Sequence, residues 1–227
     1  MARRDSAHVP AADAARAAVR RLAGELTPVR EWVVQAQREL SAVDQAIYSA
    51  VAATPTPSLD EPLRRLSNAA NNSRLWLAAA AGLGVAGGRA GRRAAVRGLV
   101  AVGVTSALVN LALKSAWSRQ RPDAADARVP GQRNVRMPSS TSFPSGHAAS
   151  GFAFAAAVGR DRPWLGLALR FVAAAVAYSR VHTGVHYPSD AVVGSLIGEG
   201  IGQAAAGLLD QRLSTRWPSR SRPGPAS

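Results

Sequence analysis

The segment Phe143-Pro-Ser-Gly-His-Ala-Ala-Ser150 (FPSGHAAS) places a histidine between a Pro-Ser-Gly turn and an alanine-rich apolar run. That run continues from His147 to Gly159, which predicts a helix that begins near His147. Gly146 lets backbone N–H groups approach a ligand closely, and the positive end of the helix dipole favours an anion there. Ser145 either caps this helix or offers its hydroxyl to a ligand. The segment therefore predicts a helix with an anion-binding turn in front of it.

The composition favours an anionic partner and excludes several kinds of site. The chain has 227 residues and a formal net charge of +14 at pH 7. Such a balance suits a membrane surface, a nucleic acid or a phosphorylated substrate. The sequence contains no cysteine, which excludes disulfides, thiolate metal sites and a cysteine nucleophile.

Five apolar stretches are separated by segments that carry arginine. They are Leu75–Gly88, Gly98–Leu113, His147–Gly159, Trp164–Tyr178, which Arg170 interrupts, and Ala191–Leu209, which Glu199 interrupts. A bilayer core needs about 20 helical residues, so several stretches span it only with their flanking residues. We expect an all-α fold, a membrane-embedded antiparallel helical bundle of about five spans. The alternative is a soluble bundle of buried alanine-rich helices.

The sequence divides into three expected parts. Residues 1–59 have charges and apolar residues at helical spacing, which predicts an N-terminal amphipathic helical arm on the membrane surface. An ordinary solvated helix or a partly disordered tail would explain this segment equally well. Residues 60–209 form the expected helical domain, and residues 210–227 a basic, disordered tail.

A second polar cluster stands at the end of an apolar stretch. Lys114, the single lysine of the chain, ends the second stretch, and Arg121 follows seven residues later, before Pro122 stops the helix. Seven residues make about two helical turns, so both cations can lie on one side of the helix end. Alone, this cluster is also compatible with a basic patch that contacts lipid head groups.

The third cluster, residues 179–190, contains Arg180, His186 and Asp190. Pro188 suits the first turn of the last apolar helix, which places His186 just outside that helix and Asp190 in its first turn. An acceptor at Asp190 can hold one ring nitrogen of His186 and leave the other free as a nucleophile or base. Arg180 supplies a forked cation for phosphate oxygens.

If consecutive helices alternate in direction, all three clusters lie on one side of the bundle. The residues expected to converge there are two histidines, His147 and His186, one aspartate, the three cations Lys114, Arg121 and Arg180, and the turn of Ser145 and Gly146. That set is typical of phosphoryl transfer through a phosphohistidine, where cations hold the oxygens, one imidazole attacks phosphorus and the other protonates the leaving oxygen. No carboxylate cluster offers a site for a divalent cation, so we expect no metal and no other cofactor.

The motifs K-x6-RP, PSGH and SR-x5-H-x3-D occur in this order at residues 114–122, 144–147 and 179–190. In motif order and spacing the chain resembles the type-2 phosphatidic acid phosphatase superfamily, which includes lipid phosphate phosphatases, polyprenyl diphosphate phosphatases and vanadium haloperoxidases. The resemblance covers about residues 60–209. It implies an α-helical core and a reaction without a metal ion.

Carried over by position, the resemblance implies a role for eight residues. His186 would be the nucleophile, Asp190 would orient it, and His147 would be the general acid for the leaving alcohol. The phosphate would be bound by Lys114, Arg121, Ser145, Gly146 and Arg180. His182 is not a fixed position of the motifs, and we expect it to be a structural or pocket-wall residue.

The expected function is removal of the terminal phosphate from an isoprenoid or glycerolipid phosphate, by metal-independent hydrolysis through a phosphohistidine. The expected partners are this lipid phosphate and the membrane, and not nucleic acid. One alternative is a haloperoxidase that uses bound vanadate. The other is a non-catalytic basic membrane protein that binds anionic lipid or nucleic acid.

The charges of the loops bear on orientation in the cell membrane. Short loops opposite the expected site carry many arginines, at 89–93 and 160–162. By the positive-inside rule that side is cytoplasmic, and the site faces outward. The basic N-terminal arm, without the apolar segment of a signal peptide, indicates the opposite. We predict a multi-pass membrane protein and favour the extracytoplasmic orientation of the site.

Overall fold

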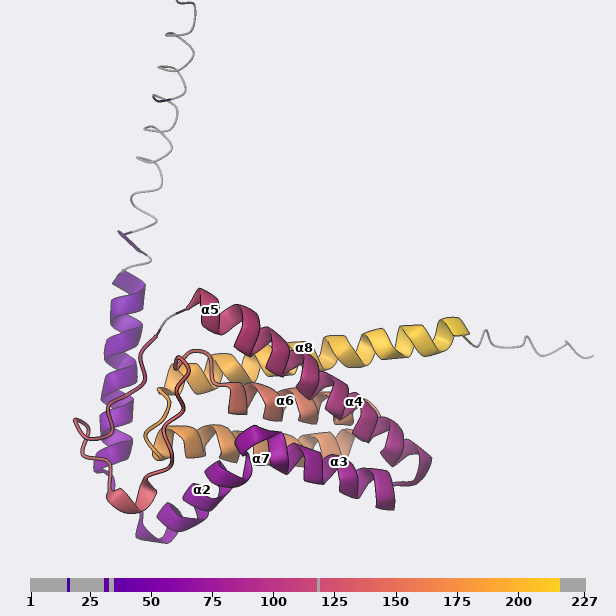
Figure 1. Ribbon diagram of the computed structural model, residues 1–227, viewed down its shortest axis with the longest axis horizontal. Helices are drawn as coiled ribbons and strands as arrows, with labels where there is room; N and C mark the ends of the chain where they lie inside the picture. Colours follow the sequence, from indigo (N-terminus) through magenta and orange to yellow (C-terminus); the bar gives the residue numbers. More distant parts are fainter. Residues whose placement is uncertain (1–15, 17–30, 33–34, 118, 217–227) are drawn as a thin grey trace, which may run out of the picture. The chain divides into compact units, whose positions relative to one another are not determined.

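The computed structural model describes residues 16, 31–32, 35–117 and 119–216, and their ordered elements are all helical (Figure 1). Most of the predicted arm and residues 217–227 of the predicted tail lie outside the described residues, while residues 210–216, at the start of that tail, are helical. From Gln45 onward the chain forms one compact unit, distinct from the unit Met1–Asp44. The unit from Gln45 contains every residue of the predicted site, and all that follows concerns it.

After a helix that ends at residue 53, the elements follow in the order of the chain. They are α2 (Pro57–Ala69), the 3-10 turn η1 (Asn71–Ser73), α3 (Arg74–Ala86), α4 (Gly88–Ala107), the π-helical segment η2 (Leu108–Leu113), α5 (Lys114–Ala116), the 3-10 turn η3 (Gly131–Arg133), α6 (Gly146–Gly159), α7 (Pro163–His182) and α8 (Pro188–Arg216). The expectation of an all-α fold is confirmed, and each of the five predicted apolar stretches lies mainly in a helix.

Helix α6 forms the centre of the bundle, where it packs against α4, α7 and α8 (Figure 1). Between Ala148 and Val158 every residue except Phe152 is buried. Most of these residues are alanine or glycine, so the neighbouring backbones can approach closely. The alanine-rich composition that follows His147 thus explains why this short helix lies inside the bundle.

Three glycines of α8, four residues apart, lie directly against the backbone of α6. A Cβ atom on any of them would overlap a backbone oxygen of α6, because Gly194 meets Ser145, Gly198 meets Ala149 and Gly202 meets Ala153. Residue numbers rise together along both helices, so α6 and α8 are parallel. A hydrogen bond from Ser145 N to Asp190 O, 2.9 Å long, joins their first turns. The amino ends of both helices therefore lie at the same end of the bundle.

Three helical segments are long and apolar enough to cross a membrane: Gly88–Leu113, Pro163–His182 and Pro188–Arg212. Helices α3 and α6 have 13 and 14 residues, or about 20 Å each, which is shorter than a bilayer core. Arg170 and Glu199, the charges that interrupt two of the apolar stretches, form an ion pair between α7 and α8. Charges within such segments are retained where they pair with each other.

The contact between α6 and α8 gives a prediction about stability. Gly198→Ala should lower the melting temperature of the detergent-purified protein, because overpacking a tight contact destabilises by about 1–3 kcal/mol. Gly200→Ala is the matched control, since a Cβ atom there meets nothing within 4 Å. Alanine is the better helix former, so the control should be neutral or stabilising. Equal melting temperatures for the two variants would contradict the packing described here.

Candidate active site

The three polar clusters meet around one cavity of about 260 Å³ at the amino ends of α6 and α8. Five of the eight predicted site residues line it: Lys114, Arg121, Gly146, His147 and His186. The other three, Ser145, Arg180 and Asp190, are buried and do not line it. Asp190 contacts the Nδ1 atom of His186. Arg180 and Ser145 are buried near the residues that line the cavity.

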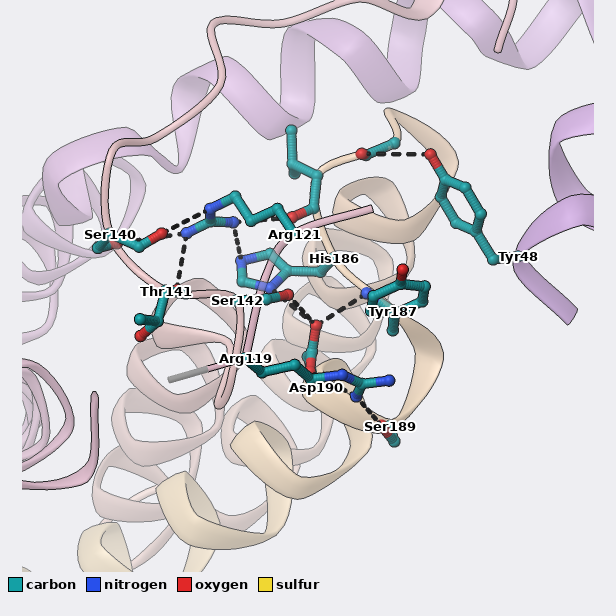
Figure 2. A network of polar contacts seen from close by, with 12 residues as sticks. Tyr48, Arg119, Arg121, Ser140, Thr141, Ser142, His186, Tyr187, Ser189 and Asp190 are labelled. Carbon is teal, nitrogen blue, oxygen red and sulfur yellow. Dashed lines mark hydrogen bonds and ion pairs between the residues drawn. The ribbon is translucent and has the colours of Figure 1, made fainter. Parts of the chain in front are cut away.

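His186 is held between an acid and a cation (Figure 2). Its Nδ1 atom lies 3.4 Å from Asp190 Oδ2, and its Nε2 atom lies 3.2 Å from Arg121 Nη1. The contact with Asp190 is longer than an ordinary hydrogen bond, so it is mainly electrostatic at this separation. Asp190 therefore selects the ring orientation that turns Nε2 toward Arg121.

Burial is the main cause that lowers the pKa of the His186 ring, and the charges of Arg121 and Arg180 act in the same direction. The contact with Asp190 acts in the opposite direction, and the net result is a pKa of about 4. The imidazole is consequently neutral at physiological pH, and the lone pair of its Nε2 atom accepts a hydrogen bond from Arg121. A neutral ring is the form that can attack phosphorus.

The Asp190 carboxylate is fully buried and has several donors (Figure 2). Arg119 Nη1 lies 3.0 Å from Oδ1, and the backbone N–H of Tyr187 donates to Oδ2 over 2.9 Å. The Ser142 hydroxyl also donates to Oδ2. The Arg119 guanidinium stacks 4.3 Å from the centre of the Tyr187 ring, which fixes its position. These contacts hold the carboxylate in its charged form and in one orientation.

His147 occupies the first turn of α6, and its Nε2 atom lies 2.9 Å from Asn71 Oδ1. An amide oxygen only accepts, so Nε2 carries the proton in this contact. Burial, followed by the positive charges of Arg180 and other groups in the site, lowers the pKa of His147. A phosphate dianion in the cavity would oppose these charges and raise the pKa again.

The predicted phosphate-binding cations are held by protein oxygens. Lys114 Nζ donates to Ser140 Oγ over 3.0 Å. Arg121 donates to the carbonyl oxygens of Ser140, Thr141 and Val185, over 2.8, 3.1 and 2.7 Å. These bonds preorganise the Arg121 guanidinium beside His186 and fold the loop of residues 138–142 onto the cavity.

Two further predicted residues retain buried polar atoms. Arg180 Nη1 donates to Ser67 Oγ of α2 over 2.6 Å, while its Nε atom has no partner among the described residues. The Ser145 hydroxyl is buried, makes no helix-capping bond and has no partner in the described part of the chain. Unpaired buried donors are rare, and an anion is a suitable acceptor for both.

His182 lies outside the cavity, which agrees with the expectation of a structural residue. Its Nε2 atom is 3.0 Å from Asp60 Oδ1, and Arg133 Nε is 2.8 Å from the same oxygen. Arg133 is fully buried and also donates to the carbonyl oxygens of Val51 and Thr54. This cluster, which we call the Arg133 anchor, fixes the middle of the segment 117–145 to the region around α2.

A family model described as the PAP2 superfamily matches residues 95–213, which is more than half of the chain. The chain belongs to the PAP2 superfamily. The match contains all three motifs and both histidines that line the cavity. The match begins after η1, so Asn71 lies outside the matched region while its partner His147 lies inside it.

Curated relatives carry one name, decaprenylphosphoryl-5-phosphoribose phosphatase. That of Mycolicibacterium smegmatis is 35% identical over 162 residues, covering 70% of this chain and 83% of the relative. That of Mycobacterium tuberculosis H37Rv is 44% identical over 91 residues, covering 40% of this chain and 48% of the relative. In that second match the chain spans about half of the relative's length.

Two solved structures share the PAP2 fold. One is the transmembrane PAP2-type phosphatidylglycerolphosphate phosphatase of Bacillus subtilis, with a TM-score of 0.59 and 24% identity, covering 81% of this chain and 90% of that one. The other is LpxE of Aquifex aeolicus, with a TM-score of 0.57 and 22% identity, covering 72% and 94%. At this identity they support the fold alone.

The sequence analysis missed three residues of this PAP2 site: Asn71, Arg119 and Ser142. Arg119 and Ser142 hold Asp190, and each lies within three residues of a fixed motif position. Arginines are common in this chain, so nothing marked Arg119 as different from the others. Asn71 is 76 residues from His147, and its contact follows only from the fold. Among the described residues, no group of three or more His, Cys, Asp or Glu could hold a metal ion.

The contact between His147 and Asn71 predicts opposite changes in the pH profile of kcat for two variants. If His147 acts as the acid, activity is lost as pH rises through its pKa in the substrate complex. Asn71→Asp adds an anion that raises this pKa, so the alkaline limb should move to higher pH. Asn71→Leu removes the acceptor, so the limb should move to lower pH and kcat should fall about tenfold. An alkaline limb that is unchanged in both variants would exclude Asn71 as a positioning residue.

Proposed function

We propose that this PAP2 protein is a membrane phosphatase that removes the terminal phosphate from a polyprenyl-linked phosphosugar. One observation carries the proposal: two histidines from the amino ends of parallel helices line a single cavity that also contains Lys114 and Arg121. The name shared by the mycobacterial relatives supports a lipid-linked phosphoribose as the substrate class.

The first chemical step is transfer of the phosphoryl group to His186. Nε2 of the neutral ring attacks phosphorus, the bond to the sugar oxygen breaks, and His147 gives that oxygen a proton. A protonated imidazole has two N–H donors, so His147 can keep its bond to Asn71 and still donate to the leaving group. Asp190 stabilises the positive charge that develops on His186.

In the second step water attacks phosphorus of the phosphohistidine. The neutral His147 now accepts a proton from this water, the N–P bond breaks, and inorganic phosphate forms. Lys114 and Arg121 stabilise the charge on the phosphoryl oxygens in both steps, with Arg180 and Ser145 as further donors. The cycle returns both histidines to their starting states and needs no other reactant.

We also propose that the site faces away from the cytoplasm. At the opposite end of α6, the first two turns of α4 carry Arg89, Arg92 and Arg93, and the turn between α6 and α7 carries Arg160 and Arg162. Positive charge is retained on the cytoplasmic side of membrane proteins. A substrate on the outer side would then enter at the amino ends of α6 and α8.

The central experiment measures phosphate release from a polyprenyl-linked phosphoribose and traps the phosphoenzyme. His186→Ala should abolish release by at least about a thousandfold and remove an acid-labile, base-stable phosphoenzyme. His182→Gln is the matched control, because this histidine lies four residues earlier and outside the cavity. Activity should persist in EDTA and fall with vanadate. Full activity of His186→Ala, or activity that depends on added magnesium, would refute the mechanism.

The lowered pKa of His186 predicts the acidic side of the pH profile. Because a lowered pKa favours the neutral ring, the nucleophile stays available as pH falls until it approaches about 4. The profile of kcat/KM should therefore keep its activity at pH 5 and decline near pH 4. A decline centred at pH 6 to 7, where an ordinary histidine titrates, would show that burial does not lower the pKa of this ring.

A further inference from the structure

The residues that line the cavity of the site fall into two chemical groups. One group is Lys114, Arg121, His147 and His186, whose side chains are charged or titratable. The other group is the neutral polar side chains of Asn72, Ser73, Ser106, Asn110 and Ser150. No acidic residue is among the described residues that line the cavity. The first group suits the phosphoryl group, and the second offers hydroxyl and amide groups to a neutral polar ligand.

Two of the neutral polar residues, Ser106 and Asn110, lie on a stripe along α4 and η2. Ser106, Asn110 and Lys114 follow at four-residue spacing and all line the cavity. In a regular α-helix eight residues make about 2.2 turns, which would rotate Lys114 away from the face of Ser106. The π-helical segment Leu108–Leu113 has a wider turn, which compensates for this rotation. The π-helix thus aligns the two neutral groups with the cation.

Ser106 and Asn110 are unusual for their position. Both lie in Gly88–Leu113, one of the segments long and apolar enough to span a membrane. Polar side chains in such a segment normally face an interior cavity or a functional site. Asn110 Nδ2 donates to the backbone oxygen of Ser106 over 2.9 Å. The side-chain oxygen of Asn110, Oδ1, has no partner among the described residues. The Ser106 and Ser150 hydroxyls are 3.4 Å apart, which is a weak contact.

Ser150 lies on α6, and the turn η1 supplies the last two neutral residues, Asn72 and Ser73. Asn72 and Ser73 have φ values of 54° and 58°, in the left-handed region that non-glycine residues seldom adopt. Such strain persists where the surrounding structure imposes it, and it occurs often at binding sites. The same turn carries Asn71, the partner of His147. One strained turn therefore positions both the catalytic acid and two polar groups at the cavity.

The cavity is larger than a phosphate needs. Four phosphate oxygens at about 30 Å³ each, the share of a water molecule in the liquid, fill about half of the 260 Å³. The remaining space lies against hydroxyl and amide groups, so an alkyl chain there would leave their hydrogen bonds unmade. A small polyol directly attached to the phosphate would satisfy them.

We propose that Ser106, Asn110 and Ser150, with Asn72 and Ser73, bind the hydroxyl groups of a sugar that carries the phosphate to be removed. The inference rests on the proposed function and adds the residues that select the substrate class. The sugar would lie between the phosphate, which Lys114 and Arg121 bind, and the lipid chain. The enzyme would then distinguish a phosphosugar from a phosphate attached directly to a lipid.

The test compares two substrates with the same prenyl chain, one with a 5-phosphoribose head group and one that is a simple monophosphate. The variant is Ser106→Ala/Asn110→Leu/Ser150→Ala, and the measured quantity is the ratio of the two kcat/KM values. Loss of two or three hydrogen bonds should lower the preference for the phosphosugar by about 10- to 100-fold. The ratio is independent of the folded fraction, since both substrates report on the same active molecules.

Ser195→Ala is the matched control, because this α8 hydroxyl bonds to Ala191 O of its own helix and does not line the cavity. It should keep the ratio of the unmodified protein. A ratio that is unchanged in the triple variant, or an unmodified protein that prefers the simple monophosphate, would overturn the inference. Failure of the proposed function would differ from both outcomes, since the unmodified protein would then hydrolyse neither substrate.

Discussion

The site depends on the close parallel packing of α6 and α8. Glycines of α8 allow the two backbones to touch, and the hydrogen bond from Ser145 N to Asp190 O locks the register at the first turn. His147 begins one helix and His186 immediately precedes the other. Because the connecting helix α7 runs in the opposite direction, one chain can bring both amino ends to the same place. The distance between the two histidines is thus set by backbone contacts rather than by mobile side chains.

This packing also concentrates positive charge. The partial charges of two helix amino ends add to those of Lys114, Arg121 and Arg180 in a buried region. Burial first, and then the charges of Arg121 and Arg180, lower the pKa of Lys114, which reflects the repulsion among these groups. An anion bound among these cations would relieve that repulsion. Oriented donors of this kind need little reorganisation during phosphoryl transfer.

Much of this architecture could be predicted from the sequence, and particular residues show which features could not. The ordered motifs singled out eight candidate residues, five of which line one cavity, and alternating helix direction explained why the motifs meet. The actual helix lengths were not readable from the apolar stretches, and α3 and α6 proved shorter than a membrane is thick. Arg170 and Glu199 looked like interruptions of apolar stretches, and only the fold shows that they pair. The partners of His147 and Asp190 come from distant segments without a periodic pattern, so no local rule could find them.

The Arg133 anchor divides the long segment between α5 and α6 into two shorter tethers. One tether carries Arg119 and Arg121, and the other carries Ser140, Thr141 and Ser142. The entropy lost when a loop closes grows with its length, so each tether on its own has less conformational freedom to lose than the whole segment would have without the anchor. A buried arginine that does not line the cavity thereby constrains both halves of the segment that contributes Arg121 and Ser140 to the cavity wall.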